Sequence, residues 1–187
     1  MHKIIGVSGS PKISRGAAYF YLKKIGINDI VSSYKYNLKD IKKITKADTI
    51  VITFPLYVDS LPSHFLNFLN LLRESKLTNK NIYAICNLGF YEGIQGDIAL
   101  DIINNFCIRT NNNYKGGISI GTGPIGYMKY PLMNTGIKRN LKKLKKAIKN
   151  KDEFKNKFIQ AKIPRFIYRK CANIAFNHEI RKHLIRK

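Results

Sequence analysis

The chain has 187 residues, of which 44% are hydrophobic, and this suits one globular domain or one domain with an extension. No apolar run approaches the roughly 20 residues of a membrane-spanning helix, and the N-terminus leads directly into a strand pattern, so we expect no membrane span and no signal peptide. Cys86, Cys107 and Cys171 form no C-x-x-C pair, which excludes the usual zinc and iron–sulfur motifs. We expect them to be reduced packing residues of a cytoplasmic protein.

The positive charge is the unusual property of the composition. The formal net charge is +23, and 18 of the 34 Lys and Arg residues follow Thr135, against three acidic residues in the same stretch. Such a surface could face nucleic acid, anionic lipid or acidic small molecules. A bias toward lysine on solvated faces explains the same number without a partner, and we favour that interpretation.

Apolar runs and helical spacings alternate along the chain. The predicted strands are residues 4–8, 30–34, 49–54, 81–87 and 117–121. The predicted helices are residues 17–25, 40–45, 64–73, 95–106 and 136–151. This alternation predicts right-handed crossovers and an α/β fold: a doubly wound, flavodoxin-like, five-stranded parallel sheet of order 2-1-3-4-5. We assign residues 1–151 to this domain and residues 152–187 to a basic helical extension.

Three loops follow the first, third and fourth predicted strands, where ligands of open α/β sheets bind. The first, Ser8-Gly9-Ser10-Pro11-Lys12-Ile13-Ser14, combines small residues and hydroxyls before a helix, which predicts an anion cradle. The second, residues 55–65, is stiffened by two prolines and exposes Tyr57. The third, residues 87–97, carries glycines at positions 89, 93 and 96 around an aromatic pair. Together the loops predict a site for a flat, phosphorylated ligand.

Residues 121–126, Gly-Thr-Gly-Pro-Ile-Gly, match G-x-G-x-x-G letter for letter. The dinucleotide fingerprint requires a following helix and an acidic residue about 20 positions later, and this segment runs into Tyr-Met-Lys-Tyr-Pro instead. We interpret it as a loop that borders the ligand or a dimer contact.

Three stretches carry a resemblance to a known family: GSPK after the first strand, ADTIVITFPLYVDSLPS, and CNLGFYEGIQGDIALDIINNFC. Over about residues 1–151 they resemble the NADPH-dependent FMN reductases, and more narrowly the NAD(P)H-dependent oxidoreductases of anaerobic Gram-positive bacteria. The resemblance implies an FMN-containing enzyme in which hydride passes from NADPH or NADH through FMN to a quinone, a flavin or a similar acceptor. It implies no catalytic side-chain acid or base and no metal ligand.

The resemblance also implies which residues bind FMN. The phosphate would lie on the first loop and the helix start, and the isoalloxazine ring between the second and third loops. These residues are Ser8, Ser10, Lys12, Ser14, Gly16, Ala17, Pro55, Leu56, Tyr57, Val58, Asn87, Gly89, Phe90 and Tyr91. Family members commonly carry hydroxyls where this chain reads Gly16-Ala17-Ala18, so weaker phosphate binding is expected here unless Ser14 or a nearby cation compensates.

Two alternatives remain open from the sequence. One is a flavodoxin-like electron carrier, which a strongly basic surface disfavours, and the other is a non-catalytic binding module with a basic tail. We expect a homodimer, because family members often pair near the flavin. Nucleic acid is a less favoured partner, since no helix-turn-helix or stacking platform is evident, and a membrane-surface contact through the tail remains open.

Overall fold

The computed structural model describes residues 2–13, 16–123 and 134–185, and within its last helix the side chains of residues 165–174 and 177. The elements up to the fifth strand are β1 (Ile4–Ser8), α1 (Ala17–Lys24), β2 (Ile30–Ser32), α2 (Leu38–Thr45), β3 (Thr49–Pro55), α3 (Ser63–Glu74), β4 (Asn81–Asn87), the short 3-10 helix η1 (Gly93–Gly96), α4 (Asp97–Arg109) and β5 (Asn113–Ile120). They are followed by α5 (Thr135–Asn150), β6 (Lys157–Ile159) and α6 (Arg165–Ile185).

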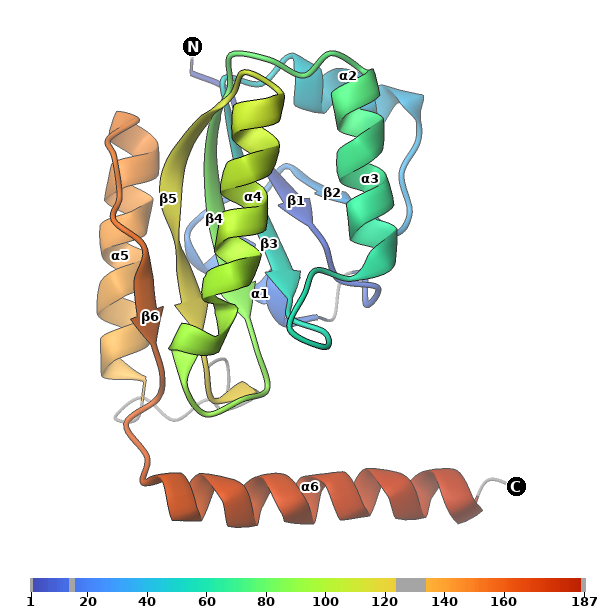
Figure 1. Ribbon diagram of the computed structural model, residues 1–187, viewed down its shortest axis with the longest axis vertical. Helices are drawn as coiled ribbons and strands as arrows, with labels where there is room; N and C mark the ends of the chain where they lie inside the picture. Colours follow the sequence, from blue (N-terminus) through green and yellow to red (C-terminus); the bar gives the residue numbers. More distant parts are fainter. Residues whose placement is uncertain (1, 14–15, 124–133, 186–187) are drawn as a thin grey trace.

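The strands form one parallel sheet of order β2-β1-β3-β4-β5-β6 (Figure 1). The first five strands confirm the predicted fold class and order. The number of strands was wrong, because β6 adds a sixth strand that pairs with β5 through Lys157, Phe158 and Ile159. This strand lies within the extension, residues 152–187, which was predicted to be helical. The extension therefore begins as a further strand of the sheet and becomes helical only at α6. The division of the chain at residue 151 itself stays a prediction.

Alternation along the central strands assigns side chains to the two faces of the sheet. In β3, Ile50, Ile52 and Phe54 join the cluster under α2, α3 and α4, whereas Val51 joins the cluster under α1 and α5. β4 alternates in the same way, with Tyr83 on the α5 face. A sheet covered on both faces favours strands that are apolar along most of their length, and all seven residues of β3 are buried.

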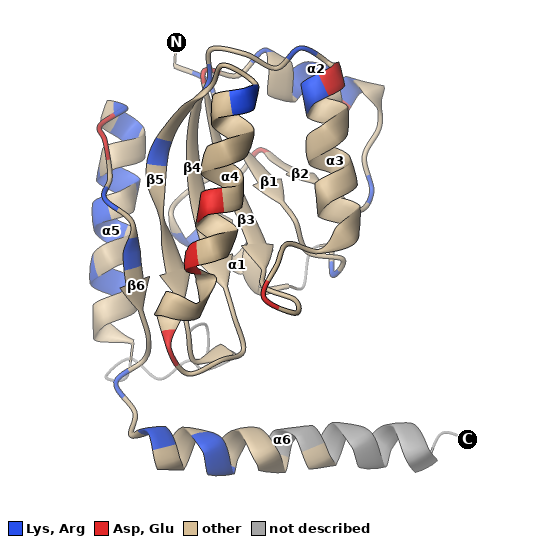
Figure 2. Cartoon of the chain, viewed as in Figure 1, with Lys and Arg blue, Asp and Glu red and all other residues tan. Residues whose placement is uncertain are grey.

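Basic residues are dense on α5 and on the strands beside it (Figure 2). α5 carries seven Lys and Arg residues and no acid, and its apolar residues all face the sheet. The basic residues of α5 and of the neighbouring β5 and β6 lie on one edge of the sheet, whereas α4 carries Asp97 and Asp101. None of the ion pairs found among the described residues involves α5. Among the described helices, none is long and apolar enough to cross a membrane.

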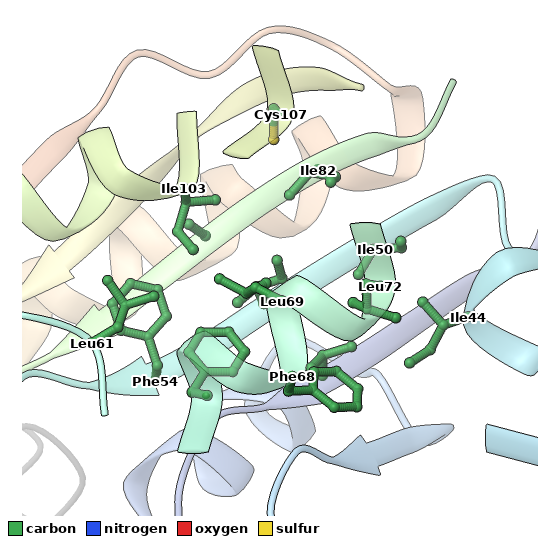
Figure 3. Close-up of a cluster of buried hydrophobic side chains, with 14 of the residues drawn as sticks. Ile44, Ile50, Phe54, Leu61, Phe68, Leu69, Leu72, Ile82, Ile103 and Cys107 are labelled. Carbon is green, nitrogen blue, oxygen red and sulfur yellow. The ribbon is translucent and has the colours of Figure 1, made fainter. Parts of the chain in front are cut away.

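The packing of α3 and α4 fixes one side of the sheet (Figure 3). Phe68, Leu69 and Leu72 of α3 point toward Ile50 and Phe54 of the sheet, at the helical spacing that the sequence showed. Each such side chain contributes roughly 1.5–3 kcal/mol by leaving water. Because these residues are fully packed, the loops at the ends of the strands are held on a rigid base.

Candidate functional site

The loops after β1, β3, β4 and β5 converge at the carboxyl edge of the sheet and enclose a cavity of about 210 Å³. β1 lies between β2 and β3, so the chain reverses its direction of winding beside this cavity, which is where such folds bind ligands. The lining residues are Ser10, Lys12, Gly16, Ala17, Ala18, Pro55, Leu56, Tyr57, Asn87, Leu88, Gly89 and Gly123.

The loop after β1 and the start of α1 form one end of the cavity. Ser10 Oγ accepts a hydrogen bond from the Lys12 N–H at 3.2 Å, and the Gly16 N–H donates to the Lys12 carbonyl at 3.1 Å. A Cβ on Gly16 would lie 2.6 Å from Ser10 Oγ, so this close turn requires glycine. The turn aims the first residues of α1 at the cavity.

The N-terminus of α1 has no side-chain cap and no acidic residue in its first turn. The Phe20 N–H donates to the Gly16 carbonyl at 3.1 Å, so the N–H groups of Ala17, Ala18 and Tyr19 precede the first hydrogen bond of the helix. These donors, together with the helix dipole and the Lys12 side chain, favour an anion. The hydroxyls missing from positions 17 and 18 therefore leave the backbone part of an anion site in place.

The loop after β3 forms a second wall. The Leu56 N–H donates to the Asn87 carbonyl at 2.9 Å, and Tyr57 and Ser60 exchange backbone hydrogen bonds. Val58 and Asp59 have φ of 48° and 55°, and this left-handed backbone forms the tight turn between Tyr57 and Ser60. The turn leaves Tyr57 half-exposed on the cavity and directs Val58 into solvent, where it is 95% exposed.

The loop after β4 forms the opposite wall. The Leu88 N–H donates to the Ile120 carbonyl, and the Gly123 N–H returns to the Leu88 carbonyl, so the loops after β4 and β5 are paired. A Cβ placed on Gly89 would meet nothing within 4 Å, so this position borders open space. Within the described part of the chain, Asn87 Oδ1 is buried without a hydrogen-bond partner, although Asn87 lines the cavity. An unpaired buried amide oxygen is costly and fits a ligand N–H.

Nine of the fourteen predicted site residues line the cavity, namely Ser10, Lys12, Gly16, Ala17, Pro55, Leu56, Tyr57, Asn87 and Gly89. Ser8 is fully buried beneath the loop, and its hydroxyl has no partner among the described residues. Val58, Phe90 and Tyr91 do not line the cavity, and Ser14 lies outside the described residues.

The sequence missed Ala18, Leu88 and Gly123. Gly123 belongs to the G-x-G-x-x-G segment, so the interpretation of that segment as a loop beside the ligand is consistent with its position; residues 124–126 lie outside the described part. Tyr91 turns away from the cavity, because its hydroxyl donates to the Ile163 carbonyl at 2.6 Å.

The cysteines do not form a site. Burial raises the pKa of both Cys86 and Cys107 to about 12, so these core thiols stay protonated at neutral pH. Cys171 is exposed on α6, which corrects the expectation that all three are packing residues. Among the described residues, no group of three His, Cys, Asp or Glu side chains is arranged to hold a metal ion.

Solved structures show the fold of the chain. An NADH:FMN oxidoreductase in its apo form matches 79% of this chain and 90% of its own, with a TM-score of 0.58 and 13% identity. A flavodoxin from the domain Archaea matches 80% of this chain and 97% of its own, with a TM-score of 0.57 and 16% identity.

A third structure, the rubredoxin:oxygen oxidoreductase from the anaerobe Desulfovibrio gigas, matches 81% of this chain with a TM-score of 0.56 and 11% identity. The chain spans 36% of the length of that protein. No family model and no curated protein sequence matches the chain. The flavodoxin-like fold that the sequence predicted is thereby confirmed, and what the site binds is a matter for the proposal below.

Proposed function

We propose that this protein is an FMN-dependent oxidoreductase that passes a hydride from NADH or NADPH to a quinone, a free flavin or a similar small acceptor. The observation that carries the proposal is the cavity at the carboxyl edge of the sheet. Among the described residues, the helix N-terminus at one end of it has no side-chain cap, and the Asn87 amide oxygen on its wall has no hydrogen-bond partner. The similarity in fold to an NADH:FMN oxidoreductase supports it.

The residues present fit FMN. The phosphate would accept hydrogen bonds from the first N–H groups of α1, with the Lys12 ammonium adding charge. The isoalloxazine ring would lie between Tyr57 on the β3 loop and Gly89 on the β4 loop, and Asn87 Oδ1 would accept from a ring N–H. Aromatic contact and a glycine wall suit a flat ring system, because one stacks on it and the other allows close approach.

Bound FMN supplies the redox chemistry, and the chain supplies binding and orientation. Lys12 and Tyr57 are the only ionisable side chains among the described residues that line the cavity. Among the described lining residues there is no carboxylate or imidazole to move a proton, and this agrees with the proposed acceptors, because quinones and flavins take their protons from solvent.

An electron-carrier function is the second candidate, because a flavodoxin is among the structures that match the chain. The surface charge argues against it. Carriers of this kind typically present acidic surfaces, whereas this chain carries +23 and an α5 free of acids.

The test separates the two functions. FMN-loaded, full-length protein is mixed under anaerobic conditions with NADH or NADPH, and the flavin absorption band is followed before and after addition of a quinone. We expect rapid bleaching by one dinucleotide and recovery on addition of the quinone. Bleaching by a one-electron reductant but by neither dinucleotide would contradict the enzyme and favour the carrier.

The assembly is a separate proposal. We propose a homodimer on the basis of the family resemblance, and a cytoplasmic location on the basis of the cysteines, which form no C-x-x-C pair. Light scattering of the purified protein gives the molar mass directly, and a mass near that of one 21.5 kDa chain would contradict the dimer.

A further inference from the structure

The segment of residues 159–168, here called the closing segment, lies against the two loops that form the β4 side of the cavity. It contains the end of β6, a connector and the first turn of α6, which Figure 1 shows running below the carboxyl edge of the sheet. The Gly121 N–H donates to the Ile159 carbonyl at 2.8 Å, and the Ala161 N–H donates to Thr122 Oγ1 at 2.9 Å. These bonds hold the β5 loop from outside the cavity.

Tyr168 contacts Gly89 and Gly123, the two glycines of this wall that line the cavity. Its side chain is buried, and its hydroxyl donates to the Gly89 carbonyl. A Cβ on Gly123 would lie 3.2 Å from the same hydroxyl, so Tyr168 is packed directly behind Gly123. Glycine has no side chain that could restrict its backbone by packing. The hydrogen bond from Tyr168 therefore restricts the backbone of Gly89 from outside the loop.

Further contacts join the closing segment to the β4 loop. Tyr91 donates to the Ile163 carbonyl at 2.6 Å, and its ring lies 5.7 Å from the Tyr168 ring. Arg165 pairs with Glu92 at 3.1 Å, but its side chain is 67% exposed, so this ion pair contributes little. The two tyrosines are therefore the main anchors.

We propose that Tyr168 is a positioning residue of the flavin pocket, and that the closing segment holds the β4 and β5 loops in the geometry that receives the ring. The inference rests on the proposed function for the identity of the ligand. Its physical basis is preorganisation: a wall that is already ordered loses less conformational entropy when the ligand binds. This gives the C-terminal extension a role at the site that the sequence left without an assignment.

The decisive variant is Tyr168→Phe, which removes the hydroxyl and keeps the ring. Tyr114→Phe is the matched control, because Tyr114 also donates one hydrogen bond to the extension, to Asn156 Oδ1 at 2.9 Å, and does not line the cavity. The first measurement is FMN affinity by fluorescence quenching. We expect Tyr168→Phe to bind FMN roughly fivefold to tenfold more weakly, as the loss of one hydrogen bond predicts, and Tyr114→Phe to bind as the unmodified protein does.

The second measurement is amide hydrogen exchange without FMN. The Thr122 and Gly123 amides donate to the Phe90 and Leu88 carbonyls, and they report the pairing of the two loops. We expect both to exchange about fivefold faster in Tyr168→Phe, with the amide of Val51 in β3 unchanged. Unaltered exchange in both loops would overturn the positioning role.

The two measurements separate the inference from the proposed function. If the unmodified protein binds no FMN, the proposed function fails, and the exchange rates still decide whether Tyr168 orders the wall. If the protein binds FMN and Tyr168→Phe changes neither affinity nor exchange, the inference is wrong and the function stands. Equal losses of affinity in Tyr168→Phe and Tyr114→Phe would show a general effect of the extension on stability and would also overturn it.

Discussion

The two ends of the cavity are built in different ways. The anion end is made from residues close together in the chain: Ser10, Lys12, Gly16, Ala17 and Ala18 lie within nine consecutive positions. The opposite wall is made from loops after two strands and is braced by Tyr168, which is 79 positions from Gly89. The first end is encoded locally, whereas the second depends on the folded sheet and on the extension. Changes at the two ends should therefore have different consequences.

The largest effect is expected when the open wall is filled. In Gly89→Leu the new Cβ meets no protein atom within 4 Å, and because Gly89 lines the cavity we expect the added side chain to compete with the ligand for space. We expect FMN affinity to fall at least about 100-fold in fluorescence titrations, while the thermal midpoint stays close to that of the unmodified protein. Gly136→Leu on α5 is the control, since a Cβ there also meets nothing within 4 Å. Unchanged FMN affinity would show that the ligand does not bind beside Gly89.

A methyl group at the locally built end should act on both fold and site. Gly16→Ala places a Cβ 2.6 Å from Ser10 Oγ and 3.1 Å from the Lys12 carbonyl. We expect FMN to bind about tenfold more weakly and the free energy of unfolding to fall by about 1–2 kcal/mol in urea titrations.

The control for that substitution is Gly136→Ala, in the first turn of α5. It should raise stability by a few tenths of a kcal/mol to about 1 kcal/mol, because alanine is the better helix former. If Gly16→Ala lowered stability without any loss of FMN affinity, the turn would be structural and the phosphate would lie elsewhere.

A smaller effect is expected from the charge at the anion end. Lys12→Gln removes the cation that lines the cavity, and we expect FMN affinity to fall about threefold to tenfold at low ionic strength. The loss should shrink as salt rises, since Lys12 is exposed and its charge is screened. Lys24→Gln, at the other end of α1, is the matched control and should leave the affinity unchanged. An equal loss of FMN affinity in both variants would show that the net charge of the protein causes the effect, and not the position of Lys12.

The smallest effect on FMN affinity is expected at Tyr83 of β4, which contacts the end of α5 and the residues after it and does not line the cavity. The Tyr83 hydroxyl lies 2.6 Å from the Asp152 carbonyl oxygen and 3.1 Å from the Ala147 carbonyl oxygen, so it donates its one proton to this pair of acceptors. Tyr83→Phe should lower the free energy of unfolding by about 1 kcal/mol at neutral pH and leave FMN affinity unchanged. A marked loss of FMN affinity would show that the extension acts on the site as a whole rather than through Tyr168.

The same variant gives a pH test. Burial, and to a smaller extent the charge of Asp152, raises the pKa of Tyr83 from 10.0 to about 12. Between pH 10 and pH 12 the unfolded phenol ionises while the folded one does not, so rising pH favours unfolding of the unmodified protein. The stability difference between the unmodified protein and Tyr83→Phe should be largest below pH 10 and should shrink toward pH 12. A constant difference, measured by urea unfolding, would contradict the assignment.

The sequence predicted those parts of the molecule that local patterns encode. The strand predicted over residues 49–54 and the helix predicted over residues 64–73 are both present as β3 and α3, and each buries most of its apolar residues. The position of the loop after β1 was also predicted, because small residues stand there between a strand pattern and a helix pattern, whereas its binding of an anion stays a prediction. These features depend on residues that are close together in the chain, so a single sequence is enough to predict them.

The remaining features depend on distant contacts. β6 has only three residues and begins with Lys157, so neither its length nor its pattern marked it as a strand, although short charged strands are common at sheet edges. Val58 points into solvent because of the positive φ at positions 58 and 59, which the two prolines of the loop did not indicate. The contact of Tyr168 with Gly89 had no local signal at all, since it arises only after β6 has joined the sheet.

The most direct test compares FMN with riboflavin, which differs from it by the phosphate. Both are titrated into the unmodified, full-length protein at one ionic strength, and their dissociation constants are compared. If the phosphate binds at the N-terminus of α1, two or three charge-assisted hydrogen bonds should make FMN bind about 100-fold more tightly than riboflavin. Equal affinities would contradict the anion end of the cavity, and no binding of either flavin would contradict the proposed function.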